Sequence, residues 1–501
     1  MHIIVQAGGR GSRLRHHTWN KPKCLVSVQG KPILYHLFDK FPDASYLIIG
    51  NYAFTFLKNY LKINPPNVKF KLIKAVEKGT CAGISKCADL VSDDVLLVWG
   101  DLLLKSTIEN DDGNVLYTTD NIICRYKATP EIEEETTNKD GIPGIFYFDK
   151  STILKNVPKS GEFVQWYKSN IKNYKIKKIN DIEEMGDFHN LEIKNKNQSF
   201  CRHFNNVKLL ESTVIKEVKD INYQHLIDKE IQWYKLANQF QLSNIPVILH
   251  TSPLTMSKIN GKHIFELENI STSIKQNILE SYIDELSKLH KSEVKPVNLE
   301  EIKDVYLTKT ISRVKKIKDI IPNFDKKEIT INGIKCKNIF VSNDWSIIDN
   351  LYDIDSFNFI HGDPTFSNSI IAENNEIFFI DPRGYFSENT YGDANYDFAK
   401  LYYSAVGGYD LFNRKKFKLY LDEETVELIQ EKTGFEEIAD LVFENKLGKK
   451  RLEQIKTIHG LLWLSLSGYA LDDIDSILGA FYYGLYWLTL QQKCRPQICQ
   501  A

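Results

Sequence analysis

Two short strings, one near each end of the chain, restrict what this sequence can fold into. The apolar segment HIIVQA at residues 2–7 runs directly into GGRGSRLRHHTWNKPK. Far downstream, FIHGDPTFSNSII at residues 359–371 is followed by IFFIDPRG at residues 377–384. Glycines that follow a strand let the backbone approach a phosphate and aim its N–H groups at the oxygens. The second string offers carboxylate and amide oxygens, which suit Mg²⁺. Both patterns are typical of phosphate chemistry.

Length and charge narrow the possible classes of protein. The 501 residues suggest two or three domains. Lys and Arg number 64 against 65 Asp and Glu, so the chain has no excess of positive charge with which to bind nucleic acid or an anionic membrane.

The most apolar late region is interrupted by Asp472, Asp473 and Asp475, which favours buried helices over a membrane span. Eight scattered cysteines without a CxxC pair, and no basic leader with a cleavage site, predict a cytoplasmic protein. The sequence leaves the oligomeric state open.

The first part of the chain alternates strand-like and helix-like segments. We expect strands at 2–7, 44–51, 68–75, 94–101 and 145–150, and helices at 32–41, 53–63, 82–91 and 161–171. Alternation of this kind predicts a mostly parallel sheet with helices on its faces. The polar segment EIKNKNQSF at residues 192–200 is the best boundary, so we predict one domain over residues 1–194 and a second over residues 195–501.

The second part begins with strands and continues into helices. We expect strands at 207–212 and 213–220, a helix at 225–240, a hairpin or hinge strand at 256–268, and a helix at 282–291. From about residue 394 onward the sequence predicts nearly continuous helix. This order is that of a small strand-rich lobe feeding a helical lobe.

The N-terminal string resembles the GxG(S/T)R…PK signature of the sugar-nucleotide and phosphocholine nucleotidyltransferases. The resemblance continues through LVSVQGKPILYHLF, EKGTCAGI and VLLVWGDLL. It implies a Rossmann-like α/β domain in which Arg13 pairs with the leaving phosphates of a nucleoside triphosphate and Lys23 with the attacking phosphate. The residues that it implies for nucleotide binding are Gly8, Gly9, Gly11, Ser12, Gly79 and Thr80.

The same resemblance implies a Mg²⁺ site. Asp101 ends a predicted strand and matches the acidic residue that holds the metal. A turn aspartate is common at such a position, but the order of the motifs favours the ligand. For the second ligand, EMGDFHNLE is the best match to the late acidic segment of the family and points to Glu184, with Asp181 as the competitor.

The downstream string resembles the aminoglycoside phosphotransferase and choline kinase superfamily, in which HGDxxxxN precedes ID. The resemblance implies a bilobal, protein-kinase-like α+β domain of that type. Asp363 would accept the proton of an attacking hydroxyl, and Asn368 and Asp381 would hold Mg²⁺. His361 would support the loop, and Asp393 and Asp397 in YGDANYDFAKL would brace the fold rather than touch substrate.

The nucleotide end of this second site departs from the pattern. Lys216 in TVIKEV and Glu230 on the following helix match the nucleotide-binding ion pair of the superfamily. Residues 203–216, however, contain no glycine, where many relatives keep a glycine-containing phosphate loop. ATP would therefore be clamped without a glycine loop.

Together the two resemblances imply a bifunctional enzyme. One domain would use ATP to phosphorylate a sugar or polyol, for example a ketohexose. The other would transfer a cytidylyl group from CTP, with Mg²⁺ at both sites, to give a CDP-linked precursor of a surface (capsular) polysaccharide. The compact first domain favours CTP. Arg383 stands where choline kinases carry an acidic residue, and it suits a polyhydroxylated or anionic acceptor better than an amino alcohol.

Three alternatives stay open. The pair of domains could be a choline or ethanolamine kinase joined to a phosphocholine cytidylyltransferase. It could be a UTP- or dTTP-type sugar-1-phosphate nucleotidyltransferase carrying a degenerate kinase domain. It could also be a non-catalytic nucleotide sensor, although a scaffold has no reason to keep Lys23, Asp101, Asp363, Asn368 and Asp381 together.

Overall fold

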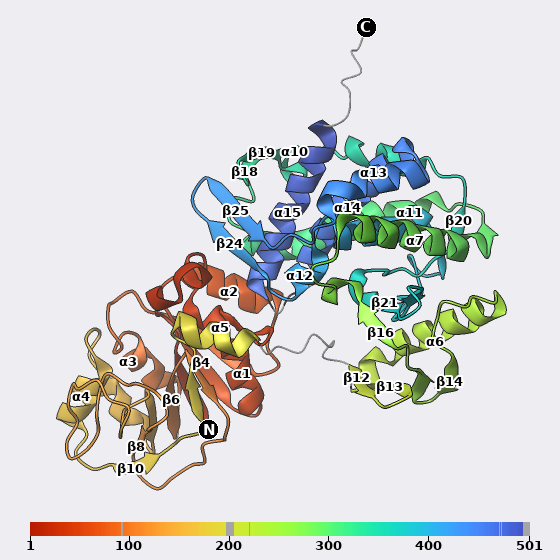
Figure 1. The fold of residues 1–501 in the computed structure, drawn as a ribbon. Helices are drawn as coiled ribbons and strands as arrows, with labels where there is room; N and C mark the ends of the chain where they lie inside the picture. The colour runs from red at the N-terminus through yellow and green to blue at the C-terminus, as the bar shows by residue number, and fades with distance from the viewer. Residues whose placement is uncertain (92–93, 197–204, 220, 470, 472, 494–501) are drawn as a thin grey trace. The chain divides into compact units, whose positions relative to one another are not determined.

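The chain folds into two compact units. The structure is a computed structural model that describes residues 1–91, 94–196, 205–219, 221–469, 471 and 473–493 (Figure 1). One unit comprises Met1–Gln198 and Leu471–Asp475, and the other comprises Ser199–Ala470 and Ser476–Ala501. The predicted boundary segment at 192–200 begins inside helix α5 (Phe188–Lys196), and its remainder lies outside the described residues. Within the described ranges, no helix combines the length and the apolar character that crossing a membrane requires.

The first unit is built on a seven-stranded mixed sheet. Its strands are β1 (His2–Gln6), β4 (Ser45–Gly50), β5 (Lys69–Lys74), β6 (Val95–Trp99), β8 (Val115–Thr118), β9 (Ile145–Phe148) and β10 (Lys175–Lys178). They lie in the order β10-β8-β9-β6-β1-β4-β5. All neighbours are parallel except β9, which runs antiparallel to β6 and β8. This Rossmann-like arrangement confirms the predicted fold class.

Helices and short strands complete this unit. They are η1 (Ser12–Thr18), η2 (Lys23–Leu25), β2 (Ser27–Val28), β3 (Lys31–Pro32), α1 (Ile33–Lys40), α2 (Phe54–Ile63), α3 (Ile84–Cys87), η3 (Ala88–Leu90), β7 (Leu102–Leu104), η4 (Ser151–Asn156), α4 (Phe163–Asn170), β11 (Ile182–Glu184) and α5. The helix predicted at 82–91 is therefore a short α-helix followed by a 3₁₀ turn. The sheet core forms because β1 is apolar and sits centrally, with Ile4 in register with Leu47 and Leu97 and fully buried.

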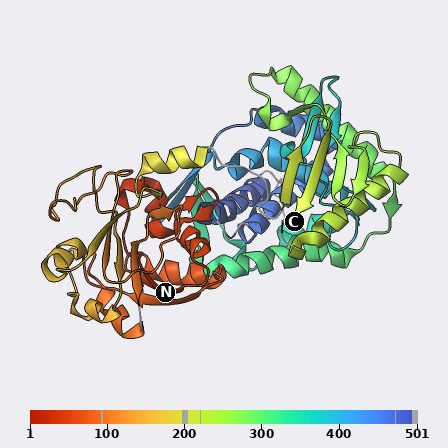
Figure 2. The ribbon, with the colours of Figure 1, turned by 90° about the horizontal axis from the view of Figure 1, so that it is seen from below.

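The second unit begins with a strand-rich lobe. The strands β12 (Asn205–Leu209), β13 (Thr213–Val218), β14 (Ile248–Thr251) and β15 (Leu254–Ser257) form an antiparallel sheet in the order β12-β13-β15-β14. Between β13 and β14 runs α6 (Gln224–Gln239), which carries the buried Trp233 and Tyr234. Figures 1 and 2 show these yellow-green strands and the blue C-terminal helices in different parts of the unit.

The rest of this unit is mainly helical. Its helices are η5 (Ile221–Tyr223), η6 (Ile264–Glu266), α7 (Thr272–Lys291), α8 (Leu299–Lys303), η7 (Asp304–Thr308), α9 (Lys309–Ile317), η8 (Lys318–Ile320), α10 (Ile339–Ser342), η9 (Ser346–Tyr352), η10 (Phe366–Asn368), α11 (Ala394–Ala405), α12 (Tyr409–Asn413), α13 (Glu436–Leu447), α14 (Lys449–Ser467) and α15 (Ile474–Lys493). Its remaining strands are β16 (Gly261–His263), β17 (Val294–Lys295), β18 (Glu328–Ile331), β19 (Ile334–Lys337), β20 (Phe357–Phe359), β21 (Ser369–Ala372), β22 (Ile377–Phe379), β23 (Tyr391–Gly392), β24 (Phe417–Leu421) and β25 (Thr425–Gln430). The two-lobed architecture agrees with the prediction.

Of the two interpretations of residues 256–268, a hairpin or a hinge strand, the hairpin is wrong, although the segment does contain a strand, β16. β16 does not pair with β15 but runs antiparallel to β21, far along the chain. An added Cβ on Gly261 would lie 2.2 Å from the carbonyl oxygen of Ile371, so the glycine permits this close strand pairing. The segment therefore joins the sheet that carries the downstream string.

The prediction of nearly continuous helix after residue 394 is also wrong. β24 and β25 form an antiparallel hairpin there, and β25 also pairs in parallel with β18. In β25 the buried Val426 and Leu428 alternate with the exposed Glu427 and Ile429, which is the period of a strand. Its parallel partner β18 pairs Thr330 with Thr425, so the partner lies far back along the chain and short-range patterns do not reveal the pairing.

Candidate active sites

The glycine string forms a loop after β1 that encloses Lys23. An added Cβ on Gly9 would lie 3.1 Å from Cε of Lys23, and one on Gly11 would lie 2.7 Å from Cβ of Lys23. Gly11 also has a φ of +68°, in the left-handed region that favours glycine. The glycines are thus needed for the close approach of the loop to this lysine.

Two cations and two carboxylates meet beside this loop. Nζ of Lys23 contacts Oδ2 of Asp101, and a guanidinium nitrogen of Arg13 lies 2.8 Å from Oε1 of Glu184. Asp101 follows β6, and Glu184 ends β11. An added Cβ on Gly186 would lie 2.7 Å from Oδ2 of Asp101 and 2.8 Å from Oε1 of Glu184, so the two carboxylates converge at this glycine. The residues come from segments more than 170 positions apart.

The donor set fits Mg²⁺. Oδ1 of Asp101 is buried and has no hydrogen-bond partner among the described residues. Burial, and then the charge of Asp101, raise the pKa of Glu184, while Arg13 lowers it. A divalent cation between the carboxylates would satisfy the orphaned oxygen and offset their repulsion. The structure places Asp181, the competing ligand, at an exposed position.

A cavity of about 740 Å³ opens at these residues. Its lining includes Gly8, Gly9, Arg13, Lys23, Asp101, Glu184, Gly79 and Thr80, together with the segment Ile122–Tyr126. Gly11 and Ser12 are not part of that lining. The hydroxyl of Thr80 donates to Oε2 of Glu162 at 3.2 Å and accepts from the backbone of Phe163 at 2.7 Å, so it holds the start of α4.

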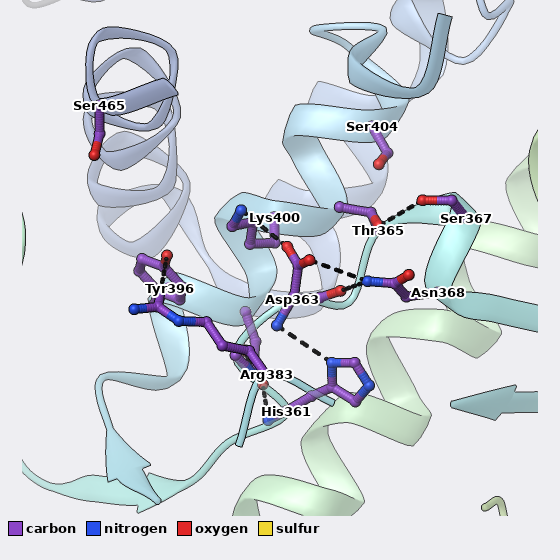
Figure 3. A network of polar contacts seen from close by, with 12 residues as sticks. His361, Asp363, Thr365, Ser367, Asn368, Arg383, Tyr396, Lys400, Ser404 and Ser465 are labelled. Atoms are coloured by element: carbon purple, nitrogen blue, oxygen red, sulfur yellow. Dashed lines mark hydrogen bonds and ion pairs between the residues drawn. The ribbon is translucent and has the colours of Figure 1, made fainter. Parts of the chain in front are cut away.

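The downstream string forms the second site in the other unit (Figure 3). Nδ2 of Asn368 donates to the carbonyl oxygen of Asp363 at 2.8 Å and to its Oδ2 at 3.1 Å. This leaves the amide oxygen of Asn368 available for a metal ion. The side chain of Asn368 therefore fixes the conformation of the loop that carries the Asp363 carboxylate.

Lys216 joins the strand-rich lobe to this site. Its Nζ lies 2.6 Å from Oε2 of Glu230 and 2.9 Å from Oδ1 of Asp381. Burial opposes the charge on Lys216, but Asp381 and Glu230 outweigh it and raise the pKa of the lysine. Asp381 has a φ of +52°, an uncommon backbone conformation that occurs at functional sites. Within the described chain no cluster of three or more His, Cys, Asp or Glu could hold a metal alone, so nucleotide phosphates and water would complete each Mg²⁺ shell.

The loop that carries Asp363 rests on a fully buried carboxylate. Oδ2 and Oδ1 of Asp397 accept the backbone N–H groups of His361 and Gly362, each at 2.8 Å. Nε2 of His290 lies 3.0 Å from the same Asp397. Nδ1 of His361 accepts the N–H of Asp363 at 3.2 Å. The expected bracing by Asp397 and His361 is therefore present in the structure.

Asp397→Ala should destabilise this second unit. Three buried donors would lose their acceptor, and removing one partner of such a buried polar set costs about 3–5 kcal/mol. In calorimetric melting of the full chain, we expect the transition of this unit to fall and that of the first unit to stay. Glu437→Ala, an exposed carboxylate on α13, is the matched control. An unchanged melting profile for Asp397→Ala would refute the bracing role.

Sequence reasoning missed Lys400. Its Nζ lies 2.9 Å from Oδ1 of Asp363, and Figure 3 shows it reaching the aspartate from α11. Burial opposes its charge, but Asp363 outweighs this and raises the pKa of Lys400. The available signal was its position three residues after Asp397 on one helix, which places both side chains on the same face.

The fold and the two sets of residues define a nucleotidyltransferase-like domain joined to a kinase-like domain. No family model matches the chain. Among curated proteins, it is 35% identical over 112 residues to the bifunctional protein GlmU of Methanocaldococcus jannaschii, covering 22% of this chain and 27% of that protein. The match thus spans about a quarter of that relative's length.

Solved structures are similar to different portions of the chain. One is the CTP:phosphocholine cytidylyltransferase LicC of Streptococcus pneumoniae, at 19% identity, with coverage of 38% of this chain and 96% of that chain and a TM-score of 0.32. Another is the aminoglycoside phosphotransferase APH(2")-IIa in complex with gentamicin, at 16% identity, with coverage of 56% and 87% and a TM-score of 0.37.

Proposed function

We propose that this chain is a bifunctional transferase. The second unit phosphorylates a hydroxyl of a sugar or polyol, for example a ketohexose, with ATP. The first unit then joins the phosphomonoester to the cytidylyl group of CTP. The product is a CDP-linked building block for a surface polysaccharide. The observation that carries the proposal is the pair of carboxylate-and-cation sites, one in each unit, each built on residues of a phosphate-transfer motif.

In the kinase reaction, the acceptor hydroxyl attacks the γ-phosphorus of ATP. Its proton passes to Asp363, a P–O bond forms, the bond between the γ-phosphorus and the bridging oxygen breaks, and ADP leaves. Lys216, which Glu230 holds at 2.6 Å, positions the ATP phosphates. Asn368 and Asp381 are the proposed ligands of Mg²⁺, which neutralises phosphate charge when bound.

In the transfer reaction, a phosphate oxygen of the phosphomonoester attacks the α-phosphorus of CTP. A new P–O–P linkage forms, the bond to the bridging oxygen breaks, and pyrophosphate leaves. No protein nucleophile is required, because the attacking phosphate is already anionic. Lys23 and Arg13 provide charge neutralisation and alignment, and Asp101 and Glu184 are the proposed metal ligands. Both nucleotides are cytoplasmic metabolites, so we propose that the enzyme acts there.

We expect CTP to be preferred over UTP, dTTP and GTP. Cytosine and uracil differ in the placement of a donor and an acceptor, so a site shaped for one leaves a polar group unpaired with the other, worth about 1–3 kcal/mol. The measurement is kcat/KM for each nucleotide with a supplied sugar or polyol phosphate. A clear preference for UTP or dTTP would instead support the alternative that the first unit is a UTP- or dTTP-type sugar-1-phosphate nucleotidyltransferase.

Mass spectrometry of the products tests the complete scheme. The full chain is incubated with ATP, CTP and a panel of hexoses, hexitols, choline and ethanolamine, and both the phosphomonoester and the CDP-linked product are expected. Turnover of choline alone would restore the choline kinase and phosphocholine cytidylyltransferase alternative.

A degenerate kinase domain is the second candidate. The turn between β12 and β13 contains no glycine, and it closes with a hydrogen bond of 2.9 Å from the N–H of Leu210 to the carbonyl oxygen of Thr213. A turn of this kind offers fewer backbone N–H groups to phosphates than a glycine loop does. If ATP is neither bound nor consumed with any acceptor, while nucleotidyl transfer proceeds, this candidate replaces the proposal.

A further inference from the structure

Four basic side chains of the second unit influence one another, and one of them, Lys400, pairs with Asp363. Lys400 is on α11, Arg383 follows Asp381, and Lys309 and Arg313 lie on α9. Lys309 and Arg313 are four residues apart and therefore share a face of that helix. None of these cations comes from the strand-rich lobe that carries Lys216.

Lys400 and Arg383 flank one aromatic ring. An NH group of Arg383 donates to the hydroxyl of Tyr396 at 2.9 Å. The Arg383 guanidinium lies 6.0 Å from the centroid of the Tyr396 ring, and Nζ of Lys400 lies 5.9 Å from it. Figure 3 shows the guanidinium beside Tyr396 and the amine of Lys400 at Asp363. The two charges therefore stand next to the proposed site of proton transfer.

Arg313 and Lys309 extend this cationic cluster. A guanidinium nitrogen of Arg313 donates to Oγ of Ser465 at 2.8 Å, and the guanidinium lies 5.1 Å from the ring centroid of Tyr469. Burial, followed by the charges of Arg383, Arg313 and Lys400, lowers the pKa of Lys309 to about 6, and Asp304 acts in the opposite direction. The positive charges of Arg383, Arg313 and Lys400 thus act on Lys309, which is largely neutral near pH 7 in the free protein and would gain its charge beside a bound anion.

Apart from Lys400, which pairs with Asp363, the cluster has no carboxylate partner within the described residues. In the described part of the chain, Lys309, Arg313 and Arg383 form no ion pair within 4.0 Å; the hydrogen bonds of the two arginines go to neutral groups. Partly buried like charges without counterions are unfavourable in the free protein. An anionic ligand would remove this cost, whereas a cationic ligand would be repelled.

The backbone is irregular directly before α9, the helix that carries Lys309 and Arg313. One turn of π-helix, Asp304–Thr308, connects α8 to α9, and such turns occur frequently at functional sites. Within it, the hydroxyl of Tyr306 donates to Oδ2 of the buried Asp393 at 2.8 Å. Because Asp393 caps α11, this bond ties the start of α9 to the helix that carries Tyr396 and Lys400.

We propose that the phosphoryl acceptor carries an oxyanion, a carboxylate or a phosphate, in addition to the hydroxyl that is phosphorylated. Arg383, Arg313 and Lys309 bind this oxyanion, and the planar guanidinium groups suit its paired oxygens. Lys400, the fourth member of the cluster, pairs with Asp363. The inference rests on the proposed kinase function and narrows its substrate class to an acidic sugar or polyol derivative.

The test compares acidic acceptors with neutral counterparts of the same carbon chain. The full chain with ATP is assayed on D-gluconate against D-glucitol, D-glycerate against glycerol, and glycerol phosphate against glycerol. We expect at least one acid to exceed its neutral partner by about tenfold or more in kcat/KM, and the carboxylate and phosphate arms identify the oxyanion. A preference for the neutral partners, or for choline, would overturn the proposal.

Variants separate acceptor binding from ATP binding. Arg313→Gln and Lys309→Gln should each raise the KM of the acid about tenfold and leave the KM of ATP within about twofold, with partial rescue by Arg313→Lys. Lys315→Gln, an exposed lysine on the same helix, should change neither constant. A rise in the KM of ATP instead would assign the cluster to the nucleotide.

Calorimetric titration with ATP, and with each acid, gives a readout without turnover. Absence of ATP binding would refute the proposed kinase function itself. ATP binding together with failure of every acid to bind would refute only the oxyanion site.

Discussion

Asp363→Asn should abolish phosphorylation and leave nucleotidyl transfer intact. The amide keeps the shape of the carboxylate but cannot accept the proton of the acceptor hydroxyl, and loss of a general base costs about a hundredfold to ten-thousandfold in rate. Two measurements on the full chain check this: ADP release with ATP and an acceptor, and pyrophosphate release with CTP and a supplied phosphomonoester.

The contacts of Asp363 sharpen this prediction. Oδ1 lies 2.9 Å from the amine of Lys400 and Oδ2 accepts from Asn368 at 3.1 Å. The variant therefore removes the charge that offsets Lys400, and the melting temperature must be followed alongside the rate. Asp355→Asn, an exposed carboxylate of the same unit, should change neither activity. If Asp363→Asn stopped nucleotidyl transfer as well, the two sites would not be independent.

Lys23→Ala should cut nucleotidyl transfer by about a hundredfold or more and leave kinase turnover unchanged. Removing one preorganised charge contact to a reacting phosphate has an effect of this order. The side chain lies against Gly9 and Gly11 and contacts Asp101, so the loop positions its charge before substrate arrives. Pyrophosphate release with CTP and a phosphomonoester is the measurement, and an unchanged rate would remove the nucleotidyltransferase assignment of this loop.

The loss of nucleotidyl transfer in Lys23→Ala must be distinguished from a loss of folded protein. Lys23→Ala leaves the buried carboxylate of Asp101 without its cation, which is destabilising. The double variant Lys23→Ala with Asp101→Asn removes that charge and should recover stability but not activity. Lys58→Ala, an exposed lysine on α2, should behave as the unchanged protein in both assays.

Many individual strands and helices of this fold could be predicted from the sequence. The strands at 2–7, 44–51, 68–75 and 94–101, the strand at 145–150, and the kinase-like order of strands and helices follow from short-range apolar patterns that tertiary packing did not override. The glycine string and HGDPTFSN were recognisable for a related reason. A phosphate cradle and a metal loop are each made by one contiguous stretch of backbone, so their residues stay together in the sequence.

Only the tertiary structure decided how distant segments meet. It paired β16 with β21 and β25 with β18, because strand partners are chosen by burial and not by proximity in the chain. It brought Glu184, and not Asp181, to Asp101. It also brought Lys309 and Arg313 of α9 into one charge cluster with Arg383, and with Lys400 at Asp363. The physical reason is that electrostatic interactions depend on distance in space, and no periodicity or spacing in the sequence encodes a charge cluster assembled from several packed elements.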